Sequence, residues 1–127
     1  MKFAYTILYV SDVKKTIDFY TSAFAFKAKF VHEGGDYAEL DTGGTTLSFS
    51  SHNLIKSLGK DPQAADYHKP SFELAFVTED VAAAVDKAVT AGAVLVQAPH
   101  DVPWGQTIAY VADINGFLVE LCTPVSG

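Results

Sequence analysis

The 127-residue sequence has no arginine, a single cysteine and a single tryptophan. Without arginine, the chain lacks the planar guanidinium that binds phosphates and carboxylates through two parallel hydrogen bonds. Nine lysines stand against 15 acidic residues, which gives a net charge of −6. Because phosphate neutralisation dominates nucleic-acid binding, this balance argues against a nucleic-acid partner and favours a neutral or cationic ligand. A second interpretation, that the charge only keeps a small protein soluble, stays open.

No apolar stretch approaches the roughly 18 residues of a membrane-spanning helix, so we expect no membrane partner. The first ten residues have the pattern of a strand and lack the cleavage site of a signal peptide. Cys122 alone cannot form an internal disulfide, which fits a reducing cytoplasm. With 49% hydrophobic residues, the chain can form one domain with a real core.

Two stretches have apolar residues at helical spacing. The first follows Asp12 and runs from Val13 to Phe24, and the second follows Asp80 and runs from Val81 to Ala88. Serine and aspartate are both favoured at a helix N-terminus, so we expect Ser11 or Asp12 to cap the first helix. Gly92 stands where a left-handed residue ends the second helix. The sequence therefore predicts one helix in each half of the chain.

Strand-like runs surround each helix and are separated by glycine-containing turns. We expect strands at residues 3–10, 26–32, 37–40 and 45–50 in the first half, and at 72–77, 94–97, 107–111 and 117–122 in the second. The order is β-α-β-β-β in both halves. The prediction is an α+β fold in a single domain, with two tandem βαβββ units at about 1–51 and 71–127 and a polar connector at 52–70, parts of which favour a helical turn.

The two halves can also be aligned residue by residue. Val10-Ser11-Asp12 matches Val77-Thr78-Glu79-Asp80 if one residue is inserted before the second helix. Near the end of each unit, residues 41–48 match residues 113–120. A repeat of about half the chain length implies two similar units related by an approximate two-fold axis.

These motifs resemble the vicinal oxygen chelate superfamily, which contains glyoxalases, bleomycin resistance proteins and extradiol dioxygenases. The resemblance covers essentially the whole chain and depends on the order of Leu8–Asp12, Asp18–Tyr20, Pro103–Gln106 and Asp113–Leu121. It implies curved mixed sheets around a cleft. Members include lyases, epimerases, dioxygenases and drug-binding proteins, so the fold alone does not assign a chemistry. Many relatives have glycine where this chain has Ala25, and a left-handed alanine there would cost about 1 kcal/mol.

Metal-using relatives place their ligands on the first and last strands of each unit. Carried over by the resemblance, these positions are Tyr5, Ser48, Phe72 and Glu120. A metal site needs at least three nitrogen or oxygen ligands, and only Glu120 is a good one. The four histidines show no ligand spacing. We therefore expect no cofactor, although a divalent metal at a non-standard site that uses Glu120 remains open.

Side chains two residues apart on a strand lie on the same face, so the neighbours of these four positions are expected to line the same pocket. Aromatic groups, hydroxyls and one carboxylate are typical of a small-molecule pocket. Trp104, in a Pro-Trp-Gly turn, resembles the aromatic residue that relatives stack on planar ligands. Plain core packing explains Tyr5, Phe72 and Trp104 about as well. The predicted ligand-binding residues are Tyr5, Ile7, Ser48, Ser50, Phe72, Leu74, Trp104, Glu120 and Cys122.

Three functional hypotheses follow. The first, which we favour, is a metal-free protein of the bleomycin-resistance type that binds a small planar or cationic organic molecule in a cleft of a homodimer. The second is a metal-dependent lyase or dioxygenase, with Glu120 as the only catalytic candidate. The third is a protein–protein interaction module. Binding is favoured over catalysis because no nucleophile stands beside a base in the sequence.

Overall fold

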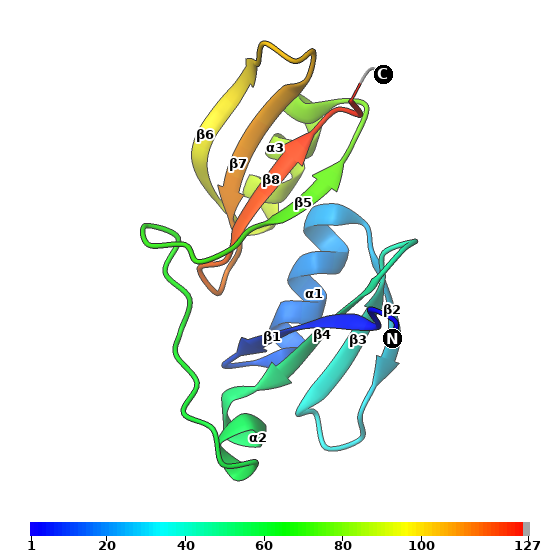
Figure 1. Cartoon of the computed structure of the whole chain (residues 1–127), viewed down its shortest axis with the longest axis vertical. Coiled ribbons are helices and arrows are strands. Elements are labelled where there is room, and N and C mark those ends of the chain that lie inside the picture. The colour runs from blue at the N-terminus through cyan, green and yellow to red at the C-terminus, as the bar shows by residue number, and fades with distance from the viewer. Residues whose placement is uncertain (126–127) are drawn as a thin grey trace. The chain divides into compact units, whose positions relative to one another are not determined.

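The computed structural model describes residues 1–125, which form two compact units divided between Ala64 and Ala65 (Figure 1). Both units have the predicted β-α-β-β-β order. The first contains β1 (Tyr5–Val10), α1 (Val13–Phe24), β2 (Lys27–Val31), β3 (Tyr37–Asp41), β4 (Thr46–Ser51) and the short helix α2 (His52–Ser57). The second contains β5 (Leu74–Val77), α3 (Val81–Ala91), β6 (Val94–Asp101), β7 (Thr107–Ala112) and β8 (Leu118–Cys122). The predicted α+β fold is thus confirmed.

Each unit contains one four-stranded mixed sheet with the same topology. The strand order is β1-β4-β3-β2 in the first sheet and β5-β8-β7-β6 in the second. The first and last strands of each unit pair in parallel, and the remaining pairs are antiparallel. The last strand of each unit, β4 or β8, therefore lies inside its sheet with a neighbour on both sides, as does β3 or β7.

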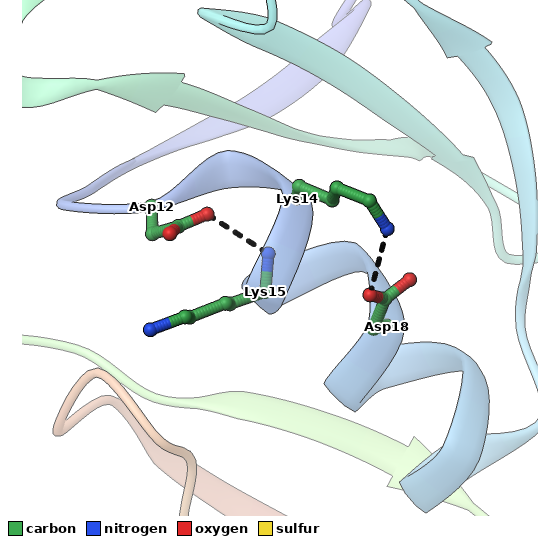
Figure 2. Close-up of polar contacts among 4 residues, drawn as sticks. All are labelled: Asp12, Lys14, Lys15 and Asp18. Atoms are coloured by element: carbon green, nitrogen blue, oxygen red, sulfur yellow. Dashed lines mark hydrogen bonds and ion pairs between the residues drawn. The ribbon is translucent and has the colours of Figure 1, made fainter.

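The same aspartate cap begins both long helices. Asp12 Oδ1 accepts a hydrogen bond of 3.0 Å from the Lys15 backbone N–H (Figure 2), and Asp80 Oδ1 accepts one of 3.0 Å from Ala83. Such a bond satisfies a backbone donor that the helix itself leaves unpaired. Of the two caps expected for the first helix, Ser11 or Asp12, the structure thus identifies Asp12. The exposed ion pair between Lys14 and Asp18 in Figure 2 contributes little, about 0.5 kcal/mol or less.

Each long helix covers one face of the sheet of its own unit. In the first unit, the ring of Tyr20 in α1 lies 5.0 Å from that of Phe49 in β4, and both side chains are fully buried. In the second unit, Val85 and Ala88 of α3 are buried together with Val119 and Leu121 of β8. Because strand side chains alternate, the neighbours of these buried strand residues point to the opposite sheet face. That opposite face carries the polar groups described below.

Several element boundaries differ from the predicted ones. β1 begins at Tyr5 rather than at residue 3, and β5 begins at Leu74 rather than at Phe72. β6 continues to Asp101, with two shifts in its pairing to β7. Ala25, which ends α1, has the left-handed conformation that the resemblance implied, with φ 61°. Within residues 1–125, no helix has the length and hydrophobicity needed to cross a membrane.

Candidate functional site

The strand register shows which residues of the two units correspond. Ser48 pairs with Ile7 in the first unit, and Glu120 pairs with Ala75 in the second. Tyr5 lies two residues before Ile7, just as Glu73 lies two residues before Ala75. The register therefore makes Glu73 the counterpart of Tyr5.

This correspondence corrects the predicted alignment, in which Phe72 was the counterpart of Tyr5. Each capping aspartate, Asp12 or Asp80, follows the newly matched residue by seven positions, so no inserted residue is needed. Phe72 lies before β5, and its ring lies 5.9 Å from that of Phe117. A shift of one residue reverses the face on which every side chain of a strand lies.

Phe72 and Leu74 therefore belong to the helix-covered side of the sheet rather than to the side of Glu120. Leu74 pairs with the fully buried Val119, whose side chain faces α3. The prediction that Phe72 and Leu74 share a face with Glu120 is wrong for this reason. Glu73, which the sequence reasoning missed, takes their place.

Three side chains of the second unit converge, and we call them the carboxylate cluster: Glu73, Tyr110 and Glu120. The Tyr110 hydroxyl oxygen lies 2.7 Å from Glu120 Oε2 and 3.1 Å from Glu73 Oε2. Tyr110 of β7 pairs directly with Glu120 of β8, whereas Glu73 reaches them from the segment before β5. Tyr110 and Glu120 are half-buried, and Glu73 is exposed.

The carboxylate cluster has too few protons for its contacts. A phenol has one proton, and an ionised carboxylate can only accept hydrogen bonds. Tyr110 can therefore donate to only one of the two glutamates at a time. Burial, together with the hydrogen bonds to Glu120 and Glu73, raises the pKa of Tyr110 far above its ordinary value of 10.0. The phenol thus keeps its proton at neutral pH, and one carboxylate oxygen faces it without a donor.

No cationic side chain compensates this arrangement in the part of the chain that the structure describes. The ion pairs there join Lys14 to Asp18 and His68 to Asp66. Cys122 lies two residues beyond Glu120 on the same strand face and is buried. Burial, and to a lesser degree Glu120, raises the pKa of the Cys122 thiol. The thiol is therefore protonated at neutral pH and is a poor nucleophile.

The first unit has a related group, which we call the hydroxyl cluster: Tyr37, Glu39 and Ser48. The Tyr37 hydroxyl donates to Glu39 Oε2 at 2.7 Å, and Ser48 Oγ lies 3.0 Å from the same phenol oxygen. Because the phenol proton is directed to Glu39, the rotatable hydroxyl of Ser48 donates to the phenol. Burial is the main cause that raises the pKa of Tyr37. Every contact in the hydroxyl cluster therefore has a proton.

The remaining predicted site residues are distributed over both units. Tyr5 and Ile7 lie on β1 with 49% and 42% of their surface exposed, on the same sheet face as the buried Ser48 and Ser50. Trp104 lies in the turn between β6 and β7 and is 61% exposed. Within the second unit, the structure brings Glu120 and Cys122 to the face that also carries Glu73 and Tyr110.

Comparison with known proteins identifies the family. The Glyoxalase/Bleomycin resistance protein/Dioxygenase superfamily matches residues 2–121, and the chain belongs to this superfamily. It is 30% identical over 125 residues to a protein of Vibrio cholerae named "Probable lactoylglutathione lyase", with 92% of this chain and 86% of that protein aligned.

Solved structures of the same superfamily share the fold. A glyoxalase-related enzyme from Fulvimarina pelagi superimposes with a TM-score of 0.84 at 23% identity, over 98% of this chain and 88% of the other. A family enzyme from Burkholderia phytofirmans superimposes with a TM-score of 0.82 at 20% identity, over 99% and 100% of the two chains. At these identities the similarity establishes the fold alone.

The donor set can now be tested against the metal that some superfamily members use. With the corrected register, the four corresponding positions are Tyr5, Ser48, Glu73 and Glu120. Two are carboxylates, one is a neutral phenol and one is a buried hydroxyl. Nowhere in residues 1–125 do three His, Cys, Asp or Glu side chains gather in a group able to hold a metal. Tyr5 and Ser48 belong to the first unit and Glu73 and Glu120 to the second, so neither unit by itself supplies at these positions the three strong ligands that a divalent transition metal needs.

Proposed function

We propose that this protein binds and sequesters a small organic cation with a planar aromatic part, without a metal and without making a bond. The observation that carries the proposal is the carboxylate cluster, in which two carboxylates contact one phenolic proton. A ligand that brings its own N–H donor would supply the missing hydrogen bond. Its positive charge would also offset two carboxylates that form no ion pair with any residue the structure describes.

The proposal specifies the ligand further. The Tyr110 proton can satisfy only one of the two carboxylates, and the best complement of the other is a charged donor, which forms hydrogen bonds about twice as strong as neutral ones. A protonated amine or an amidinium carries such a donor, whereas a quaternary ammonium carries none. The cluster should therefore prefer the protonated amine. The net charge of −6 favours a cation of either kind and does not discriminate between them.

A matched pair of cations tests this preference. The naphthylmethyl dimethylammonium ion has one N–H group, and the naphthylmethyl trimethylammonium ion has none, while ring and charge are the same. Titration calorimetry should show at least about tenfold tighter binding of the dimethyl ion, the value of one charged hydrogen bond. Equal affinity for both ions would contradict the proposed role of the missing proton.

Substitutions in the carboxylate cluster provide the second half of the test. Glu73→Gln and Glu120→Gln should each weaken binding of the dimethyl ion about tenfold or more, because each removes one negative charge that faces the ligand. Glu79→Gln is the matched control, since this glutamate is exposed and lies outside the cluster. If all three variants bind like the wild type, the ligand site lies elsewhere.

We further propose that the protein is a homodimer. Large apolar side chains on the strands of the first unit remain exposed, namely Tyr5, Ile7 and Phe30. Exposed apolar patches mark interaction surfaces, and a second copy of the chain is the occupant we expect. Light scattering should give twice the chain mass of 13.6 kDa at micromolar concentration. A mass of one chain would contradict this part of the proposal.

An enzymatic function is the second candidate, because the relative from Vibrio cholerae is named a lyase and Glu73 adds a second carboxylate beside Glu120. Glu120 would then serve as a general base. Elemental analysis after incubation with Mn, Fe, Ni and Zn separates the two candidates. About one metal per chain, lost in Glu120→Gln, would replace the binding proposal with a metal-dependent reaction.

A further inference from the structure

The turn between β6 and β7 holds the sole tryptophan of the chain in a fixed orientation, although the ring is exposed. Trp104 Nε1 donates a hydrogen bond of 2.6 Å to Gln106 Oε1. The other end of the same amide, Gln106 Nε2, donates at 2.8 Å to the backbone carbonyl of Thr123. The orientation of the indole is thus set, through Gln106, by the backbone that follows β8.

The base of this turn is braced by further bonds. The backbone N–H of Thr107 donates to Thr123 Oγ1, and the backbone N–H of Thr123 donates to the Thr107 carbonyl, both at 3.0 Å. The Thr107 hydroxyl donates to Asp101 Oδ1 at 2.7 Å, and Val102 N–H donates to the Gln106 carbonyl at 2.9 Å. The backbone on both sides of the turn that carries Trp104 and Gln106 is therefore held by hydrogen bonds.

The bond between Trp104 and Gln106 has no evident value for folding. An exposed indole N–H can bond to water, so a protein partner brings only about 0.5–1.5 kcal/mol. Fixing long side chains such as glutamine costs about as much in rotamer freedom. What the arrangement does provide is an aromatic plane, 61% exposed, that is already oriented before anything binds. Preorganisation of this kind strengthens binding by lowering its entropic cost.

We infer that Gln106 is a positioning residue that holds Trp104 as a stacking surface for the planar part of the ligand. This inference rests on the proposed function. The turn that carries Trp104 leads directly into β7, which begins at Thr107 and carries Tyr110 of the carboxylate cluster. The planar part of the ligand would then lie at Trp104, before β7, and its cationic part at the carboxylate cluster.

The free protein offers a direct test, because its only tryptophan gives an unambiguous signal. Three variants are compared with the wild type: Gln106→Leu loses both hydrogen bonds, Gln106→Glu keeps an acceptor for the indole but loses the donor to Thr123, and Gln63→Leu is the control in an exposed position. Time-resolved fluorescence anisotropy and hydrogen exchange of the indole N–H report whether the ring is held. We expect a held ring in the wild type and in Gln63→Leu, a mobile ring in Gln106→Leu, and an intermediate result for Gln106→Glu.

Binding of the naphthylmethyl dimethylammonium ion is then measured on the same proteins. Gln106→Leu should bind it about tenfold more weakly while its midpoint of thermal unfolding stays within a few degrees of the wild type. An indole that is equally mobile in the wild type and in Gln106→Leu overturns the inference, as does unchanged affinity in a variant whose ring is mobile. A held ring in a wild-type protein that binds neither naphthyl cation contradicts the proposed function instead, while the positioning of Trp104 by Gln106 stands.

Discussion

The two units share a topology but differ by one proton in their polar clusters. In the hydroxyl cluster, Ser48 donates to Tyr37 and Tyr37 donates to Glu39, so each contact has a hydrogen atom. In the carboxylate cluster, Glu73 and Glu120 both depend on the single proton of Tyr110. Duplication of a fold therefore preserves the backbone, while the two sets of side chains serve different purposes. The first cluster is complete by itself, and the second is complete only with an external donor.

The two clusters share one position, that of Ser48 and Glu120, whereas Glu39 is the register counterpart of Tyr110. Ser48 and Glu120 hold the same position on the last strand of their units, but a hydroxyl can donate and accept, whereas a carboxylate only accepts. The two residues also differ in burial, because Ser48 is fully buried and Glu120 is half-buried. A self-satisfied cluster can be sealed from water, and an unsatisfied one must stay open to a ligand or to solvent.

The largest effect is expected when one cluster is converted into the other. Ser48→Glu would place a second carboxylate beside Tyr37 and Glu39 in a fully buried position, where none of the described residues forms an ion pair with the hydroxyl cluster. We expect the free energy of unfolding to fall by about 3–5 kcal/mol, the cost of an uncompensated buried charge. Urea denaturation measures it, and a loss below about 1 kcal/mol would show that the two clusters are not distinguished by their protons.

The reverse exchange is the matched control for this prediction. Glu120→Ser gives the second unit the hydroxyl that the first unit has at this position, so that Tyr110 donates to Glu73 alone. The free energy of unfolding should change by less than about 1 kcal/mol, because no charge is left without a partner. Binding of the naphthylmethyl dimethylammonium ion should nevertheless be lost.

The phenols of Tyr110 and Tyr37 are also expected to contribute differently to stability at alkaline pH. In the folded protein the pKa of Tyr110 is raised far above its ordinary 10.0, mainly by burial and then by the hydrogen bonds to Glu120 and Glu73. Above pH 10 the unfolded chain loses this proton while the folded one retains it. Stability is therefore fully present below pH 10 and falls as the pH rises, by at most about 1.4 kcal/mol per pH unit from this one group.

Variants isolate the contribution of Tyr110 from that of every other group. The unfolding free energy of Tyr110→Phe should decline less steeply between pH 10 and 11 than that of the wild type. Tyr37→Phe should change the slope less, because the hydrogen bond from Ser48 lowers the pKa of Tyr37 and opposes the effect of burial. Parallel curves for the wild type and Tyr110→Phe would mean that Tyr110 ionises alike in both states.

The sequence predicted what local chemistry determines. Both aspartate caps and the order of helices and strands depend on residues that are close in the chain, and all of them are confirmed. The register of β5 depends instead on pairing with β8, more than 40 residues away, and there the alignment failed by one position. The signal was present, because Phe72, Leu74 and Phe76 form an alternating apolar set that suits a helix-covered face and leaves Glu73 on the other.

Other parts of the site could not be predicted from the sequence. Tyr37, Glu39 and Tyr110 lie on middle strands whose partners are set by sheet order rather than by spacing in the chain. The bond between Trp104 and Gln106 depends on the rotamers of two side chains in a turn, which no periodicity encodes. The positions to which we assign ligand specificity in our proposal are therefore those fixed by tertiary structure alone.

The smallest change in stability is expected from substitutions at the residues that end the two long helices. α1 ends at Ala25 with φ 61°, and α3 ends at Gly92 with φ 123°. The Cβ atom makes a positive φ costly for alanine but not for glycine. Ala25→Gly should therefore raise the free energy of unfolding by about 0.5–1 kcal/mol, after the greater freedom of glycine in the unfolded chain is deducted. Gly92→Ala should lower the free energy of unfolding. Chemical denaturation of both variants and of the wild type measures the two changes. Changes of the same sign would contradict this explanation.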